Sequence, residues 1–106
     1  MPFVHLNELR VVERLPGWQG RYFHSDNMTF AHYVFVRGSS IHEHSHAQEE
    51  VYEVIEGELE VSIDGAVQIA RAGSVAIVPA GVRHSLKAIT DGHVIVVNSP
   101  RRPEFG

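Results

Sequence analysis

The sequence predicts an all-β domain, a sandwich or barrel built from short antiparallel strands. Three observations lead to this fold class. Runs rich in Val, Ile, Tyr and Phe recur along the chain, as is typical of strands. Clusters of Gly, Pro, Asn, Asp and Ser separate these runs at short intervals. Apolar periodicity indicates no helix longer than a turn. We therefore expect residues 1–106 to form a single domain.

The first third of the chain is expected to supply an N-terminal arm and three strands. Residues 1–9 have weak periodicity and form the arm. The strands are expected at 10–14, 21–23 and 28–37, with a turn at Pro16-Gly17 after the first. Trp18 follows this turn and is interpreted as an anchor in the core or in a subunit interface.

The expected strand at 28–37 (MTFAHYVFVR) is mostly apolar on both faces. Its side chains alternate as Ala31, Tyr33 and Phe35 on one face and His32, Val34 and Val36 on the other. A strand with one face in water would alternate apolar with polar residues. We therefore expect both faces to be covered, and we predict that the protein forms a homodimer.

Six further strands are expected in the rest of the chain. Residues 58–63 (ELEVSI) alternate cleanly, with Leu59 and Val61 facing inward, and Asp64-Gly65 after them predicts a two-residue hairpin. The six expected strands are 51–55, 58–63, 67–70, 75–78, 84–89 and 93–97.

Three potential metal ligands, His44, His46 and Glu50, lie close together in front of the expected strand at 51–55. In an extended segment residues two apart share a face, so these side chains can point into one interior. Neutral imidazole and ionised carboxylate bind zinc and divalent manganese, iron, cobalt or nickel. The pattern therefore predicts a metal site.

A second stretch, GSVAIVPAGVRH at 73–84, offers a fourth potential ligand. Proline cannot donate to a sheet ladder, so Pro79 ends the strand at 75–78. Gly81 permits a tight turn, and the turn leads to His84. We therefore expect His84 to complete the ligand set.

The segment from His42 to His46 also fits H-E-x-x-H, the pattern of zinc proteases. That pattern needs a helix, because only there do residues four apart lie on the same side. The segment follows Gly-Ser-Ser and leads into a β-branched strand, so we disfavour a protease.

Together the two stretches resemble the two motifs of the cupin superfamily. The first motif, G-x5-H-x-H-x3-E-x6-G, matches Gly38, His44, His46, Glu50 and Gly57. The second, G-x5-P-x-G-x2-H-x3-N, matches Gly73, Pro79, Gly81 and His84, with Ala88 in place of the final Asn. The resemblance implies a small single-domain cupin, a jelly-roll-like β-barrel (double-stranded β-helix) of two packed antiparallel sheets. It further implies a divalent metal ion (Mn, Fe, Ni or Zn) held by His44, His46, Glu50 and His84.

More distantly, the chain is similar to the cupins of pectin degradation, which open or ketonise unsaturated uronates. The shared features are H-S-H at 44–46, E-G-E-L-E at 56–60 and S-P-R-R-P-E-F at 99–105. Arg102 matches their terminal Arg. The chain departs from them at three positions: Val96 replaces a catalytic acid, Asn98 replaces an aromatic residue, and Glu50 replaces a Gln ligand.

Three residues are candidates for catalysis beside the predicted metal. Tyr52 shares the face of Glu50 and could donate a hydrogen bond or proton, although a core tyrosine is equally consistent. By analogy with cupins, Asn98 would face the cavity and orient a substrate. Arg102 would fold over the opening and pair with a carboxylate, whereas an Arg in a charged tail is usually solvated. His42 lies at the rim or in a loop.

The composition excludes several classes of protein. The net charge is −4 without a basic cluster, so no nucleic-acid footprint is present. There are no cysteines, which excludes disulfides and thiol chemistry and fits a reducing compartment. No apolar run approaches the length of a membrane span, and no signal peptide is recognisable. We expect a cytoplasmic protein that binds a small molecule, not nucleic acid or a membrane.

Three functions fit these observations. The first is a metal-dependent enzyme acting on a small oxygen-rich substrate by isomerase, lyase or dioxygenase chemistry. The second is a barrel that binds a small molecule through its metal without turnover. The third, a storage or scaffolding barrel, is disfavoured by the intact ligand set.

Overall fold

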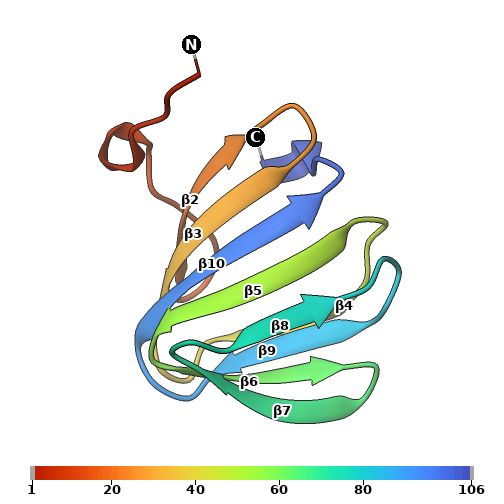
Figure 1. The fold of residues 1–106 in the computed structure, drawn as a ribbon. Helices are drawn as coiled ribbons and strands as arrows, with labels where there is room; N and C mark the ends of the chain where they lie inside the picture. Colours follow the sequence, from red (N-terminus) through yellow and green to blue (C-terminus); the bar gives the residue numbers. More distant parts are fainter. Residues whose placement is uncertain (1, 106) are drawn as a thin grey trace.

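The computed structural model describes residues 2–105, which form ten strands and two short 3-10 helices (Figure 1). A six-stranded antiparallel sheet contains, in spatial order, β1 (Val12–Leu15), β2 (Trp18–His24), β3 (Thr29–Phe35), β10 (Gly92–Ser99), β5 (Glu49–Glu56) and β8 (Val75–Val78). A four-stranded antiparallel sheet contains β4 (Ser40–His44), β9 (His84–Ala88), β6 (Glu58–Ile63) and β7 (Ala66–Arg71). The 3-10 helices are η1 (Leu6–Glu8) and η2 (Pro103–Phe105).

The two antiparallel sheets confirm the predicted fold class. Strands β6 and β8 have the expected bounds, and Asp64 and Gly65 form the predicted hairpin with φ angles of 51° and 80°. Strand β4 was not predicted from its own residues, because Ile41 is its only apolar residue. This strand is defined by pairing with β9, which lies some forty residues further along the chain.

The core lies between the inner faces of the two sheets. The alternation expected for β3 and β6 is observed, since Ala31, Phe35, Leu59 and Val61 are all buried. Trp18 is also buried and contacts Phe35, so its interpretation as a core residue is confirmed. Burying the inner faces is the main driving force that holds the two sheets together.

One motif glycine is required by the packing of the turns. Gly57, between β5 and β6, has a φ of +82°. A Cβ atom at this position would collide with the backbone oxygen of Asp91 and approach Thr90 Oγ1 at 2.7 Å. Only glycine fits such a close approach without strain.

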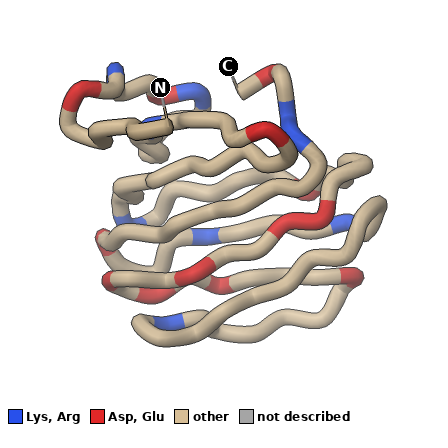
Figure 2. Tube along the Cα trace, turned by 45° about the horizontal axis from the view of Figure 1, so that its top comes forward, with Lys and Arg blue, Asp and Glu red and all other residues tan. Residues whose placement is uncertain are grey.

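The surface shows no concentration of positive charge. In Figure 2 the Lys and Arg residues are spread along the trace rather than gathered on one face. Among residues 2–105, no helix has the length and apolar character that crossing a membrane would require.

Candidate metal centre

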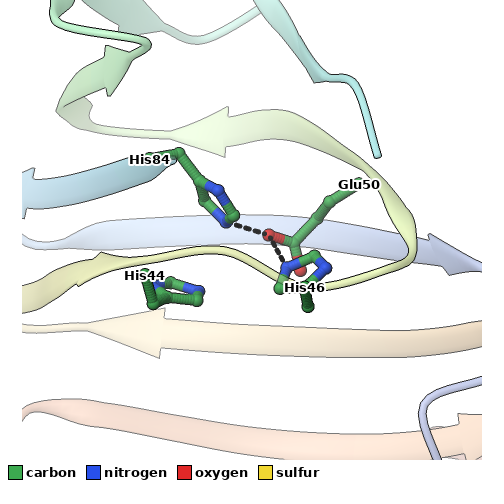
Figure 3. Close-up of side chains that lie close together, drawn as sticks. All are labelled: His44, His46, Glu50 and His84. Atoms are coloured by element: carbon green, nitrogen blue, oxygen red, sulfur yellow. Dashed lines mark hydrogen bonds and ion pairs between the residues drawn. The ribbon is translucent and has the colours of Figure 1, made fainter. Parts of the chain in front are cut away.

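The four predicted ligands meet between the two sheets (Figure 3). His44 ends β4 and His84 begins β9, and these two residues are register partners in the four-stranded sheet. Glu50 comes from β5 in the other sheet, and His46 comes from the connection between β4 and β5. One potential ligand atom from each residue lies within 4.8 Å of the other three. The structure thus brings together all four predicted ligands.

The way in which the ligands converge differs from the sequence-based argument. From their spacing, His44, His46 and Glu50 were expected on one face of a single extended segment. In the structure the chain leaves the four-stranded sheet after His44 and enters the six-stranded sheet at Glu49. Only Glu50, Tyr52 and Val54 behave as one face of one strand, and all three are buried. The site is therefore built by the closure of two sheets.

Each histidine is oriented by a backbone carbonyl two residues away. His44 Nδ1 lies 2.8 Å from the oxygen of His42, and His84 Nδ1 lies 2.9 Å from the oxygen of Val82. His46 Nδ1 lies 3.0 Å from the oxygen of Gln48. Because a carbonyl only accepts hydrogen bonds, Nδ1 must carry the proton in all three rings. Nε2 is then the atom left to bind a metal ion, as in many metal sites.

Glu50 uses its two carboxylate oxygens differently. Oε1 accepts a hydrogen bond from the Tyr52 hydroxyl and lies 3.1 Å from His84 Nε2 and 3.5 Å from His46 Nε2. Oε2 faces Arg102 Nη1 at 3.4 Å. Burial would raise the pKa of Glu50, but the contacts with His46, His84 and Tyr52 outweigh it and hold the pKa well below its usual value. Glu50 is therefore ionised at neutral pH despite its burial.

The imidazole pKa values reflect the same contacts. Burial lowers the pKa of His44, and the bond to the His42 carbonyl only partly opposes this effect. Burial alone would also lower the pKa of His84, but its hydrogen bonds to Glu50 and to Val82 raise it. A cation, either a proton on His84 or a metal ion, is thus favoured between His84 and Glu50.

The residues present fit a divalent metal ion. His46 Nε2 is buried and has no hydrogen-bond partner among residues 2–105, so its lone pair is available to bind a metal ion. Ligands about 2.1 Å from one ion are separated by up to about 4.2 Å, so the 4.8 Å spread requires only a small contraction. Imidazole and carboxylate donors suit zinc, iron, manganese and nickel, and the donor set does not distinguish among them.

A cavity of about 510 Å³ adjoins the cluster. His44 and Glu50 contribute to its wall, and Arg102 and Tyr52 lie beside them. The cavity has the size of a site for a small ligand, with an apolar lining and a few polar groups.

The three predicted catalytic residues lie at different depths. Tyr52 and Arg102 line the cavity, and both contact Glu50. Asn98 is fully buried in β10, and neither of its amide atoms has a hydrogen-bond partner among residues 2–105. In the sheet register it lies between Glu50 and Thr29, but it does not line the cavity. Its role in orienting a substrate stays a prediction.

Two side chains that line the cavity, Arg14 of β1 and Phe105 of η2, were not predicted from the sequence. The Arg14 guanidinium lies 5.0 Å from the ring centre of Phe105 and donates to the Glu104 carbonyl at 2.6 Å. Arg102 belongs to the same C-terminal segment as Phe105, and its guanidinium lies 4.1 Å from the centre of that ring. These contacts join the two ends of the chain, and no local pattern in either segment indicated them.

Comparison with known proteins identifies the family. Residues 31–99 match the family described as the cupin domain. The chain belongs to the cupin family. This cupin is 41% identical over 76 residues to an uncharacterized protein of Streptomyces coelicolor, a match covering 70% of the chain and 71% of that protein.

Two solved structures share the fold of this cupin over its full length. An RmlC-like cupin from Shewanella frigidimarina has a TM-score of 0.93 at 25% identity, and 96% of that chain is covered. KdgF from Halomonas sp. has a TM-score of 0.92 at 25% identity, and 99% of that chain is covered. The predicted small single-domain cupin is therefore confirmed.

Proposed function

We propose that this cupin is a metal-dependent enzyme acting on a small oxygen-rich substrate, such as a sugar acid or a carbonyl compound. The observation that supports the proposal is the set of three oriented imidazoles and one ionised carboxylate beside a cavity of about 510 Å³. A bound divalent ion would supply a Lewis acid for a carbonyl, enolate or water, or a centre for dioxygen chemistry if it is iron. Isomerase, lyase and dioxygenase reactions all fit this site.

The residues around the cluster would bind and orient the substrate. The Arg102 side chain is only 12% exposed and carries a guanidinium that can receive a substrate carboxylate. Burial and the neighbouring Glu50 raise the pKa of Tyr52 well above its usual value. The Tyr52 hydroxyl therefore keeps its proton at neutral pH and acts as a hydrogen-bond donor rather than as a base.

The likeness to KdgF of Halomonas, together with the sequence features shared with pectin-degradation cupins, supports a sugar-acid substrate. The departure at Val96 concerns proton transfer. Val96 lines the cavity with an apolar side chain where those cupins have an acid. We propose that this cupin shares the position of their metal site, with Glu50 in place of their Gln ligand, and their class of substrate, and that proton transfer uses a different group.

The same departure favours a second candidate function, a barrel that binds a small molecule through its metal without turnover. Glu50 is the only carboxylate among the described residues that line the cavity, and it belongs to the ligand cluster. Val96 leaves the cavity without the acid that the pectin-degradation cupins use, so substrate binding would not lead to proton transfer by their route. A ligand that binds the metal-loaded protein and is recovered unchanged would support this function.

Elemental analysis by mass spectrometry tests the proposal. Untagged protein is compared with a His44→Ala/His84→Ala variant and with a control variant, His24→Ala, which removes a histidine outside the cluster. We expect near-stoichiometric metal in the parent and the control and none in the double variant. Iron would direct the assays to oxygen uptake, and other metals to isomerase and lyase substrates. Metal-free parent protein after reconstitution would exclude a metalloenzyme.

We also propose that the protein acts as a homodimer. The support comes from β3, whose outward side chains include Val34 with 48% of its surface exposed. Light scattering at micromolar concentration tests this oligomeric state, and a monomer mass would contradict it.

A further inference from the structure

The outer face of the six-stranded sheet is largely apolar. Nine apolar side chains point outward from five neighbouring strands: Phe23, Phe30, Val34, Val51, Ile55, Val75, Ile77, Ile95 and Val97. Val34, Val75 and Ile77 are exposed by 48%, 56% and 58%. Single exposed apolar residues are ordinary, but a group of this size on one face of a sheet marks an interaction surface.

The outer face of the four-stranded sheet has a different character. Three of its four strands, β4, β9 and β6, present mainly polar side chains to solvent, among them Ser40, Lys87, Glu60 and Ser62. Apolar side chains are confined to the edge strand β7, at Val67 and Ile69. Both sheets bury their inner faces in the same core, so packing within the domain does not explain why only one outer face is apolar.

The aromatic residues on the apolar face lie close together. The rings of Phe23 and Phe30 are stacked, with centres 4.8 Å apart and planes 6° apart. His32 lies 6.0 Å from Phe23 and 5.9 Å from His93. Stacked rings form a compact layer over β2, β3 and β10 that a second sheet can cover at the usual spacing of about 10 Å.

The apolar face also carries two opposite charges in one row. The sheet register aligns Arg21, His32, Ile95, Glu53 and Val75 across strands β2, β3, β10, β5 and β8. Arg21 and Glu53 are three strands apart, which is about 14 Å. Arg21 Nε is buried and has no acceptor among residues 2–105, and Glu53 is exposed. The row thus holds a donor and an acceptor that do not reach each other.

We propose that this face binds the same face of a second copy of the chain. The two-fold axis lies in the plane of contact, runs along the strands and passes between β3 and β10. A half-turn about this axis places β10 of the second copy over β3 of the first, and β5 over β2. Positions along the strands stay the same, so residues of one row face residues of the same row. Arg21 of one copy then faces Glu53 of the other, and the pair occurs twice because a two-fold contact is self-complementary. The inference specifies the interface of the proposed homodimer and rests on that proposal.

This arrangement leaves the cavity free. None of the residues on the apolar face lines the cavity, which lies on the inner side of the same strands. The contact would instead support β3, β10 and β5 from behind. Since β5 carries Glu50 and Tyr52, the second copy would help to fix the position of the carboxylate ligand.

Sedimentation equilibrium of the full chain tests the interface. Val34→Asp places a charge in the apolar face, and Val67→Asp is the matched control on the outer face of the other sheet. We expect a dimer for the parent and the control. For Val34→Asp we expect a dimer dissociation constant that is higher by about 100-fold or more, with an unchanged circular dichroism spectrum. A monomeric parent would overturn both the homodimer and its interface. A dimer that resists Val34→Asp would overturn the interface alone.

A charge exchange tests the position of the axis without disturbing the core. Arg21→Glu and Glu53→Arg should each weaken the dimer about tenfold, because like charges then face each other. The double variant should restore dimerisation to near the parent value, since the pair is re-formed with reversed polarity. A double variant weaker than both single variants would refute this axis. His44→Ala/His84→Ala should stay dimeric, so failure of the metal site and failure of the interface are separable.

Discussion

Arg102 Nη1 lies 3.4 Å from Glu50 Oε2, the carboxylate oxygen that does not contact the histidines. Glu50 therefore connects two parts of the site. Oε1 faces His46 and His84, whereas Oε2 faces a guanidinium at the cavity wall. A metal ion and Arg102 would lie on opposite sides of one carboxylate, and each would add positive charge to the cavity. An anionic ligand is favoured in such a field.

The first prediction separates the effect of Arg102 on ligand binding from its effect on metal binding. Arg102→Gln should weaken the binding of galacturonate, a carboxylate probe, to metal-loaded protein about 10-fold to 100-fold, since a charge-assisted hydrogen bond is lost. Metal affinity should stay equal or rise, because the guanidinium repels a divalent ion. Titration calorimetry measures both affinities. Arg101→Gln, which changes an exposed neighbouring arginine, should alter neither. A parallel loss of metal would show that Arg102 supports the ligand cluster instead.

The second prediction concerns the charge of Glu50. Glu50→Gln keeps an oxygen donor but removes the negative charge, so metal affinity should fall about 10-fold to 100-fold. Glu50→Ala removes the ligand and should lower the affinity further. Glu49→Gln, one residue earlier on the outward side of β5, is the control and should behave as the parent. Competition with a chelating dye measures the affinities. Equal affinity in the parent and Glu50→Gln would show that the negative charge does not contribute, and equal affinity in Glu50→Ala would show that this residue does not bind the metal.

The third prediction concerns metal removal. The cluster joins β4, β5 and β9 from two sheets, so a metal that binds only the folded chain should stabilise it. At a free metal concentration of about 100 Kd the gain is about 2.7 kcal/mol, which raises Tm by on the order of 10 °C in a domain of this size. Chelation should reverse the shift in thermal scans. The His44→Ala/His84→Ala variant should show no shift, and an equal shift in both proteins would contradict binding at this cluster.

The fourth prediction concerns the pH dependence of the dimer. Burial, His93 and Arg21 all lower the pKa of His32 from 6.5, so the folded chain disfavours the proton. The stability gained by keeping His32 neutral is fully present above pH 6.5. It is lost as the pH falls toward the lowered pKa that His32 has in the folded chain. The facing charges are Arg21 and His93 within the chain and Glu53 of the second copy. The dimer should weaken as the pH falls below about 6.5, as measured by sedimentation. His32→Gln should flatten this dependence, and an unchanged pH profile in that variant would assign it to other groups.

The sequence predicted the strands that carry their own local pattern. The alternation in β6 and the Asp64-Gly65 hairpin are fixed by neighbouring residues, so both could be recognised. Strand β4 could not be recognised from the sequence, because its polar residues form a strand only through pairing with β9. Non-local pairing of this kind leaves no periodic trace in a polar segment.

The candidate site, too, could be predicted from the sequence only in part. The motif spacing identified the four potential ligands, because His44, Glu50 and His84 lie at or next to strand ends and His46 lies in the short connection between β4 and β5. The orientation of the imidazoles by the carbonyls of His42, Gln48 and Val82 depends on backbone angles that residue types do not encode. Arg14 and Phe105 reach the cavity from opposite ends of the chain, and only the closed barrel brings them together.

The last prediction uses the two glycines that bound the first cupin motif. Gly38 and Gly57 both have positive φ angles, +87° and +82°, so alanine costs about 1–2 kcal/mol of backbone strain at either position. At Gly38 an added Cβ meets no atom within 4 Å, whereas at Gly57 it collides with the backbone oxygen of Asp91. Gly57→Ala should therefore lower the free energy of unfolding by a further 1–3 kcal/mol or so compared with Gly38→Ala. Chemical denaturation of the two variants measures the difference. Equal losses would mean that the turn at 90–92 moves away freely, and that Gly57 is needed for its φ angle alone.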